Sequence, residues 1–174
     1  MKIYIGFSCP TGKFEPFAWL IKKVEARPYD HCYVRFQEPS GQWMIFQASK
    51  EMVNMYSILN WVAANQSLKE YEIDVTQDQS NALWSQYILP SLGIPYSLME
   101  DLGILIMKVC KWVKNNPFAK GMSAAFCSEN AARVCGFLGL KIPDDADNID
   151  PTELDSILGS LGLPCVLNPN LMAV

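Results

Sequence analysis

Histidine is the scarcest chemically informative residue of this sequence, which contains one, His31, among 174 residues. Structural zinc sites are usually built from four Cys or His ligands, with two of them closely spaced in the chain. The six cysteines are scattered and form no Cys-x-x-Cys pair: Cys9, Cys32, Cys110, Cys127, Cys135 and Cys165. We therefore expect no zinc site of the usual kind, and no metal or organic cofactor.

Three further absences narrow the class of function. Acidic residues outnumber basic ones, the formal charge is −4, and no long basic run is present, which argues against a protein that follows nucleic-acid phosphates. No apolar run approaches the roughly 20 residues that a membrane-spanning helix needs. The alternating segment Met1–Phe7 is too short for a secretory signal. We therefore expect free thiols and a cytoplasmic location. For a phage-encoded protein, the expected location is the virion or the host cytoplasm.

Half of the residues are hydrophobic, which is typical of a globular chain with a packed core. The sequence contains no repeat, low-complexity run or linker, so we expect a single domain over residues 1–174. Alternating apolar residues predict strands over residues 2–8, 31–37, 43–49, 52–58 and 71–75. Helical spacing predicts helices over residues 14–26, 78–92, 101–114, 127–138 and 154–161. The expected fold class is α+β.

The segment that begins at Cys127 carries the clearest chemical signal. Apolar residues recur at helical spacing, and a glycine follows where a helix would end: Ala131, Val134, Cys135, Leu138 and Gly139. Cys127 would lie in the first turn, where unpaired N–H groups and the helix dipole favour a thiolate. Cys127 is thus either an activated nucleophile or a buried structural cysteine at a helix start.

A cysteine nucleophile needs a base, and the base needs a group that orients it. His31 offers the one imidazole, at the start of the predicted strand 31–37. Gln47 lies on the following strand, and its side-chain oxygen could accept a hydrogen bond from the imidazole. The alternative is that His31 and Gln47 are ordinary surface or core residues.

The predicted helix over residues 101–114 is the most hydrophobic part of the chain, and it has two interpretations. It could be a core helix. Alternatively, residues 102–114 could form a peripheral membrane contact or an acyl-binding element, because basic residues and a tryptophan gather in their C-terminal half: Lys108, Lys111, Trp112 and Lys114.

Four segments together resemble a known family. They are Tyr29–Val34, Phe46–Ser49, Leu92–Tyr96, and Phe126–Glu129 followed by Ala132–Val134. They are similar to the circularly permuted branch of the NlpC-type papain-like superfamily, which includes lecithin–retinol acyltransferase-like and YiiX/YaeF-like cysteine hydrolases. In that branch the His-bearing strands precede the Cys-bearing helix. The resemblance extends over roughly residues 1–160.

This resemblance implies a permuted papain-like fold, in which an antiparallel sheet packs against a helix with the nucleophilic cysteine at its N-terminus. It implies a catalytic triad of Cys127, His31 and Gln47. It also implies that Tyr96 and Ser128 line the substrate, with Tyr96 and the Cys127 backbone N–H binding the oxyanion. The expected activity is that of a thiol-dependent hydrolase or acyltransferase on an amide or ester bond of a cell-wall peptide, a peptide or an acyl lipid.

One position departs from the family pattern, because the residue matched by Gln47 is often Glu. An amide orients an imidazole without stabilising its charged form as a carboxylate does, although Cys-His-Asn triads exist. A second hypothesis follows, in which the protein keeps the fold but serves in binding or assembly without turnover, and could be phage-encoded. A third is a membrane-surface module that uses the apolar helix.

Overall fold

The computed structural model describes every residue except 13–18, 20–21, 25, 50, 111, 119–123, 144–145 and 173–174. Its centre is a six-stranded sheet in the order β4-β3-β2-β1-β5-β6, and each neighbouring pair of strands is antiparallel. The strands are β1 (Lys2–Pro10), β2 (His31–Gln37), β3 (Trp43–Ser49), β4 (Met52–Ser57), β5 (Asn65–Asp74) and β6 (Cys165–Leu167). The expected α+β class and antiparallel sheet are confirmed.

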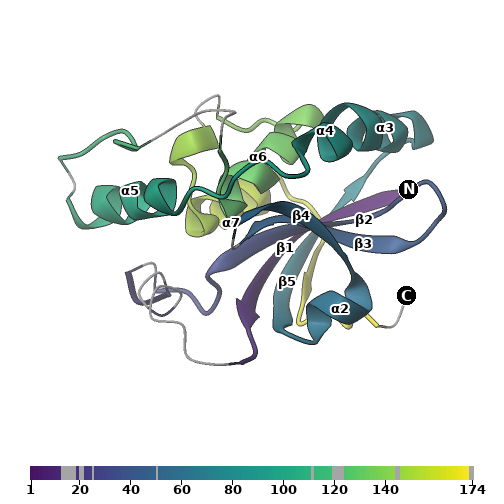
Figure 1. The fold of residues 1–174 in the computed structure, drawn as a ribbon, viewed down its shortest axis with the longest axis horizontal. Helices are drawn as coiled ribbons and strands as arrows, with labels where there is room; N and C mark the ends of the chain where they lie inside the picture. Colours follow the sequence, from purple (N-terminus) through teal and green to yellow (C-terminus); the bar gives the residue numbers. More distant parts are fainter. Residues whose placement is uncertain are drawn as a thin grey trace.

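Helices lie on both sides of this sheet, most of them on one side (Figure 1). That side carries α3 (Gln77–Ala82), the π-helical η1 (Leu83–Ile88), α4 (Leu89–Ser91), α5 (Leu98–Val109), α6 (Cys127–Phe137) and α7 (Pro151–Ser160). The 3-10 turn η3 (Ala146–Asn148) precedes α7. The short helix α2 (Ile58–Val62) lies against the opposite face of the sheet (Figure 1).

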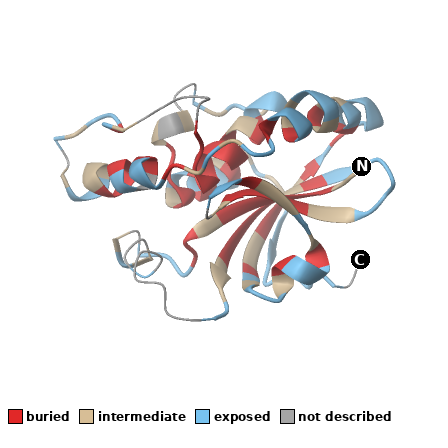
Figure 2. Cartoon of the chain, viewed as in Figure 1, coloured by how far each residue is buried: buried red, intermediate tan, exposed pale blue. Residues whose placement is uncertain are grey.

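Both faces of the sheet are buried, and Figure 2 shows the buried residues concentrated in the central strands and in α6. Cys32, Val34 and Phe36 of β2 join the larger core with α6 and α7. Tyr33, on the opposite face, packs in a smaller core with Ile45 and Trp61. Successive side chains of a strand alternate between faces, which explains this division.

The smaller core depends on a close approach between β1 and Tyr33. A Cβ atom on Gly6 would lie 2.0 Å from Cζ of the Tyr33 ring, so only glycine leaves room for it. The Tyr33 hydroxyl donates to Ser67 Oγ at 2.5 Å. Beside it, Arg35 forms a bidentate ion pair with Glu70, at 2.8 and 2.6 Å. These contacts tie β2 to β5 across β1.

The start of α7 and the end of α6 carry residues that are typical of helix termini. Asp150 accepts a hydrogen bond from the Glu153 N–H at 2.9 Å, and Pro151 occupies the first turn of α7. After α6, Gly139 has a φ of 83°, a left-handed conformation that glycine adopts without strain.

Several element bounds differ from those predicted. β5 begins at Asn65 and not at residue 71, because its polar first half pairs with β1 through backbone hydrogen bonds. Strand β6 was not predicted, and α5 spans Leu98–Val109 and not residues 101–114. Part of the predicted helix 78–92 is π-helical, and its last predicted residue, Leu92, lies beyond α4 and is 36% exposed. The predicted helix 14–26 lies mostly outside the described residues.

Candidate functional site

Cys127 is the first residue of α6, and the first turn of this helix is held in place by buried polar contacts. The Phe126 N–H donates to Glu129 Oε2 at 3.3 Å, and Glu129 pairs with Arg133 at 2.5 Å. The first N–H groups of a helix have no intrahelical partner, so they can stabilise a negative charge on the Cys127 sulfur. Cys127 is 4% exposed.

His31 is the first residue of β2, and its imidazole contacts Gln47 of β3. The two atoms, His31 Nε2 and Gln47 Oε1, are 2.9 Å apart. The indole Nε1 of Trp61 contacts the same Gln47 atom at 2.8 Å. The structure therefore brings His31 and Gln47 together, as the sequence predicted, and adds Trp61, which no sequence motif identified as a site residue.

The contact with Trp61 indicates which nitrogen of the His31 ring carries a hydrogen. An indole N–H can only donate, so the Gln47 atom that it contacts is the accepting oxygen. The amide nitrogen of Gln47 in turn donates to Ser49 Oγ at 2.9 Å. The contact between the Gln47 oxygen and His31 Nε2 then requires a hydrogen on Nε2. This leaves His31 Nδ1 as the nitrogen that can exchange a proton with Cys127.

The surroundings of Cys127 and His31 favour their charged forms. The pKa of Cys127 lies well below its usual value, because the Cys32 thiol and the His31 imidazole hydrogen-bond to its sulfur and outweigh the effect of burial. Burial alone would lower the pKa of His31, but hydrogen bonding and charge attraction to Cys127, helped by Gln47, raise it overall. Both shifts favour the same state of the pair, a thiolate beside an imidazolium.

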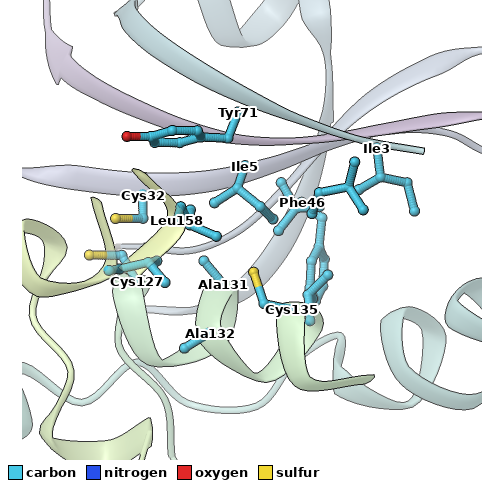
Figure 3. Packing of buried hydrophobic residues seen from close by; sticks show 14 of the residues in the cluster. Ile3, Ile5, Cys32, Phe46, Tyr71, Cys127, Ala131, Ala132, Cys135 and Leu158 are labelled. Carbon is cyan, nitrogen blue, oxygen red and sulfur yellow. The ribbon is translucent and has the colours of Figure 1, made fainter. Parts of the chain in front are cut away.

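Cys32 is a site residue that the sequence analysis did not single out. It follows His31 on β2, and its side chain is on the α6 face of the sheet (Figure 3). The sulfur atoms of Cys32 and Cys127 are drawn side by side in that view. Both its thiol and its backbone N–H hydrogen-bond to the Cys127 sulfur. The alternation of β2 assigns Cys32 to one face of the sheet but does not identify its partner on α6, so no sequence signal pointed to this contact.

Asp30, directly before His31, is a buried carboxyl group. Burial is the main cause that raises its pKa to about 6, and the negative charge of Cys127 adds to this. Lys22 Nζ, at 4.0 Å, and the His31 imidazole act in the opposite direction. The group is therefore partly protonated near pH 6, close to the reactive pair.

Tyr96 and Ser128, the two predicted substrate-lining residues, differ in their placement. Tyr96 is partly buried, and its backbone forms a parallel bridge with Ala125, just before the start of α6. Ser128 is fully buried, and its hydroxyl has no hydrogen-bond partner among the described residues. Tyr96 thus lies beside the Cys127 turn, whereas the Ser128 hydroxyl points into the protein interior. Their roles stay predictions.

The described part of the chain contains no group of three or more His, Cys, Asp or Glu side chains placed to share a metal ion. None of the helices described is both long enough and apolar enough to span a membrane.

Comparison with models of known families and with curated protein sequences finds no match. Among solved structures, the chain is similar to the crystal structure of the metalloprotein YiiX from Escherichia coli O157:H7. The two are 16% identical with a TM-score of 0.55, and the match covers 97% of this chain and 87% of that one. At this identity the likeness concerns the fold, and it agrees with the YiiX/YaeF-like resemblance of the sequence.

Proposed function

We propose that this protein is a thiol-dependent hydrolase or acyltransferase of the permuted papain-like type, with Cys127 as nucleophile and His31 as general base and acid. One observation carries the proposal: a low-pKa cysteine at a helix N-terminus contacts a histidine whose other nitrogen is held by a polar side chain. That combination is what nucleophilic catalysis by cysteine requires.

In the proposed reaction, the Cys127 thiolate attacks the carbonyl carbon of an amide or ester. The imidazolium of His31 then donates its Nδ1 proton to the leaving amine or alcohol, which leaves an acyl group on the Cys127 sulfur. His31, now neutral, takes a proton from water or from an acceptor alcohol, which attacks the thioester and regenerates the thiolate. Gln47 holds the ring by its Nε2 hydrogen throughout.

The oxyanion of each tetrahedral intermediate needs donors at the start of α6. The backbone N–H of Cys127 is one, because no carbonyl four residues earlier in a helix is available to it. The hydroxyl of Tyr96 is the second donor in this proposal, supported by the bridge that holds its backbone beside Ala125.

The surface of α5 supports a substrate with an apolar part, such as an acyl lipid, and a peripheral contact of residues 102–114 with a membrane surface. Ile104 and Leu105 are buried, but five apolar side chains of this region are exposed: Leu98, Met99, Leu102, Val109 and Trp112, the last at 83%. Several exposed apolar side chains on one short segment are typical of interaction sites. A peptide substrate remains the alternative. The cytoplasmic location stays a prediction from the free thiols.

Hydrolysis of p-nitrophenyl esters with short and long acyl chains, and of small peptide amides, tests the proposal. We expect turnover by the wild type, trapping of an acyl group on Cys127 by mass spectrometry, and loss of both in Cys127→Ala. Cys135→Ser is the matched control, since Cys135 is a buried thiol of the same helix whose pKa is raised to about 12. Turnover that survives Cys127→Ala would exclude the mechanism.

The low exposure of Cys127 favours a second candidate, a binding or assembly protein that keeps the fold without turnover. A nucleophile that is 4% exposed can meet a substrate only if the surrounding structure opens. Under this candidate, no ester or amide is turned over, and Cys127 reacts with small alkylating agents as slowly as Cys135. Fast alkylation of Cys127 together with acyl trapping would rule it out.

A further inference from the structure

Cys32 gives the proposed nucleophile a neighbour that acyl transfer does not require. A cysteine nucleophile needs a base and an oxyanion site, and both are available without a second thiol. Yet Cys32 directs its thiol and its backbone N–H at the Cys127 sulfur. The two residues come from different elements, β2 and α6, and both belong to the same buried core.

We propose that Cys32 and Cys127 form a reversible disulfide when the protein meets a peroxide, so that Cys32 is a resolving thiol that protects and switches off Cys127. The bond itself follows from the position of the two sulfur atoms, side by side in Figure 3. Its effect on activity rests on the proposed function, because only a catalytic Cys127 would lose activity.

The chemistry balances with a peroxide as the oxidant. The Cys127 thiolate attacks the O–O bond and takes one oxygen as a sulfenic acid, while the other oxygen leaves as hydroxide and becomes water on protonation. The Cys32 thiol then attacks the sulfenic sulfur, the S–S bond forms, the S–O bond breaks, and the hydroxyl group leaves with the Cys32 proton as a second water. A small thiol such as dithiothreitol reverses the bond by exchange.

Three other cysteines are less suited to this step: Cys9, Cys135 and Cys165. Cys135 is fully buried further along α6, and Figure 3 shows it apart from Cys127. Burial raises the pKa of Cys9, on β1, and of Cys165, on β6, so these thiols stay protonated at neutral pH. A protonated thiol reacts slowly with peroxide. The reaction should therefore start at Cys127 and end at Cys32.

The burial of both thiols also limits what can oxidise them. Cys32 is fully buried and Cys127 is 4% exposed, so a molecule of peroxide size is favoured over a protein oxidant. In the absence of Cys32, the sulfenic acid would have no adjacent thiol and would be oxidised further to the irreversible sulfinic acid. The expected benefit of Cys32 is thus that it keeps oxidation reversible.

The test treats the reduced protein with an equimolar amount of hydrogen peroxide, blocks free thiols under denaturing conditions, and maps cysteines by mass spectrometry without reduction. We expect a peptide pair that joins Cys32 to Cys127 and disappears on treatment with dithiothreitol. In Cys32→Ala, we expect sulfinic acid at Cys127 instead. Cys135→Ser should behave as the wild type.

The proposal is overturned if Cys127 becomes sulfinic acid equally fast with and without Cys32, if it pairs with Cys9 or with a second copy, or if peroxide leaves it unchanged. The wild-type map decides these points even if Cys32→Ala fails to fold. Ester hydrolysis measured on the same samples separates the two proposals. If the Cys32–Cys127 bond forms but no ester is hydrolysed, the proposed enzymatic function is wrong and the disulfide proposal stands. If esters are hydrolysed but the bond does not form, the disulfide proposal is wrong and the enzymatic function stands.

Discussion

Trp61 determines which end of the Gln47 amide faces His31. Its indole N–H donates to Gln47 Oε1 at 2.8 Å, and this is the oxygen that accepts from the imidazole. If the amide turned over, two N–H donors would face each other at the Trp61 contact. The short helix α2, on the far face of the sheet from α6, thereby controls the proton of the proposed base.

Replacing this tryptophan tests that role. In Trp61→Phe the ring packing against Tyr33 is largely kept, but the N–H is lost. Because a lost hydrogen bond of this kind costs about 1 kcal/mol, we expect kcat/KM on an ester substrate to fall by about fivefold to tenfold. Trp84→Phe, in η1, is the matched control and should leave kcat/KM unchanged. Equal activity of both variants would remove Trp61 from the positioning of His31.

Gln47→Glu changes the charge behind the imidazole. A carboxylate stabilises the imidazolium, so the pKa of His31 should rise further and the alkaline limb of the kcat/KM profile should move to higher pH. Gln47→Leu removes the acceptor, and we expect that limb to move to lower pH with a lower maximum. Identical pH limbs in the two variants would show that Gln47 does not contact the base during turnover.

The low pKa of Cys127 can be measured through its rate of alkylation by iodoacetamide at a series of pH values. With His31 present, the rate should reach its plateau well below the usual thiol pKa of about 8.5. In His31→Ala, the hydrogen bond and positive charge are gone, so the pKa should rise and the rate near neutral pH should fall. Cys135 in the same digest serves as the unreactive reference. An unchanged profile in His31→Ala would disprove the Cys127–His31 pair.

Asp30 should make stability depend on pH in the direction opposite to most carboxylates. Its pKa is raised from 3.8 to about 6 in the folded protein, so the folded state binds more protons than the unfolded state between these values. The contribution of Asp30 to the free energy of unfolding is fully present below about pH 4 and is lost as the pH rises through 6. The loss amounts to at most about 3 kcal/mol.

Asp30→Asn removes this titration. Relative to the wild type, the variant should gain unfolding free energy as the pH rises from 4 to 7, measured by urea denaturation at each pH. Lys22, at 4.0 Å, loses its partner in the variant, so Lys22→Gln is measured alongside it. A constant difference between wild type and Asp30→Asn over this range would contradict the raised pKa.

Two glycines provide a matched test of the packing. Gly6→Ala places a methyl group 2.0 Å from the Tyr33 ring, and we expect a loss of about 3 kcal/mol or more in unfolding free energy. Gly136→Ala, in α6, meets no heavy atom within 4 Å and should gain about 0.5–1 kcal/mol from helix propensity. Denaturant titration measures both. Similar effects at the two positions would contradict the close approach at Gly6.

The sequence predicted the parts of the fold that are encoded by local pattern. The alternation in residues 31–37 and 43–49 gave β2 and β3 with their bounds, and the apolar spacing after Cys127 gave α6. His31 and Gln47 were correctly expected to lie together. In each case, the spacing of apolar residues indicates which side chains a single strand or helix buries.

Other features depend on partners that are distant in the sequence. Residues 65–70 of β5 are mostly polar, and only their pairing with β1 makes them a strand. β6 is three exposed residues long and is held by its bonds to β5. Trp61 and Cys32 gain their importance from Gln47 and Cys127, which belong to other elements. No local pattern of the sequence could report these contacts.

The distance along the chain between His31 and Cys127 has a kinetic consequence. His31 lies on a strand near the beginning of the chain and Cys127 on a helix far along it, and they meet only when β2 lies in the sheet and α6 packs on it. Contacts of large sequence separation form late in folding, because long loops must close first. The reactivity of the Cys127 thiolate is therefore a reporter of the completed fold, and its rate of appearance during refolding would time the docking of α6 on the sheet.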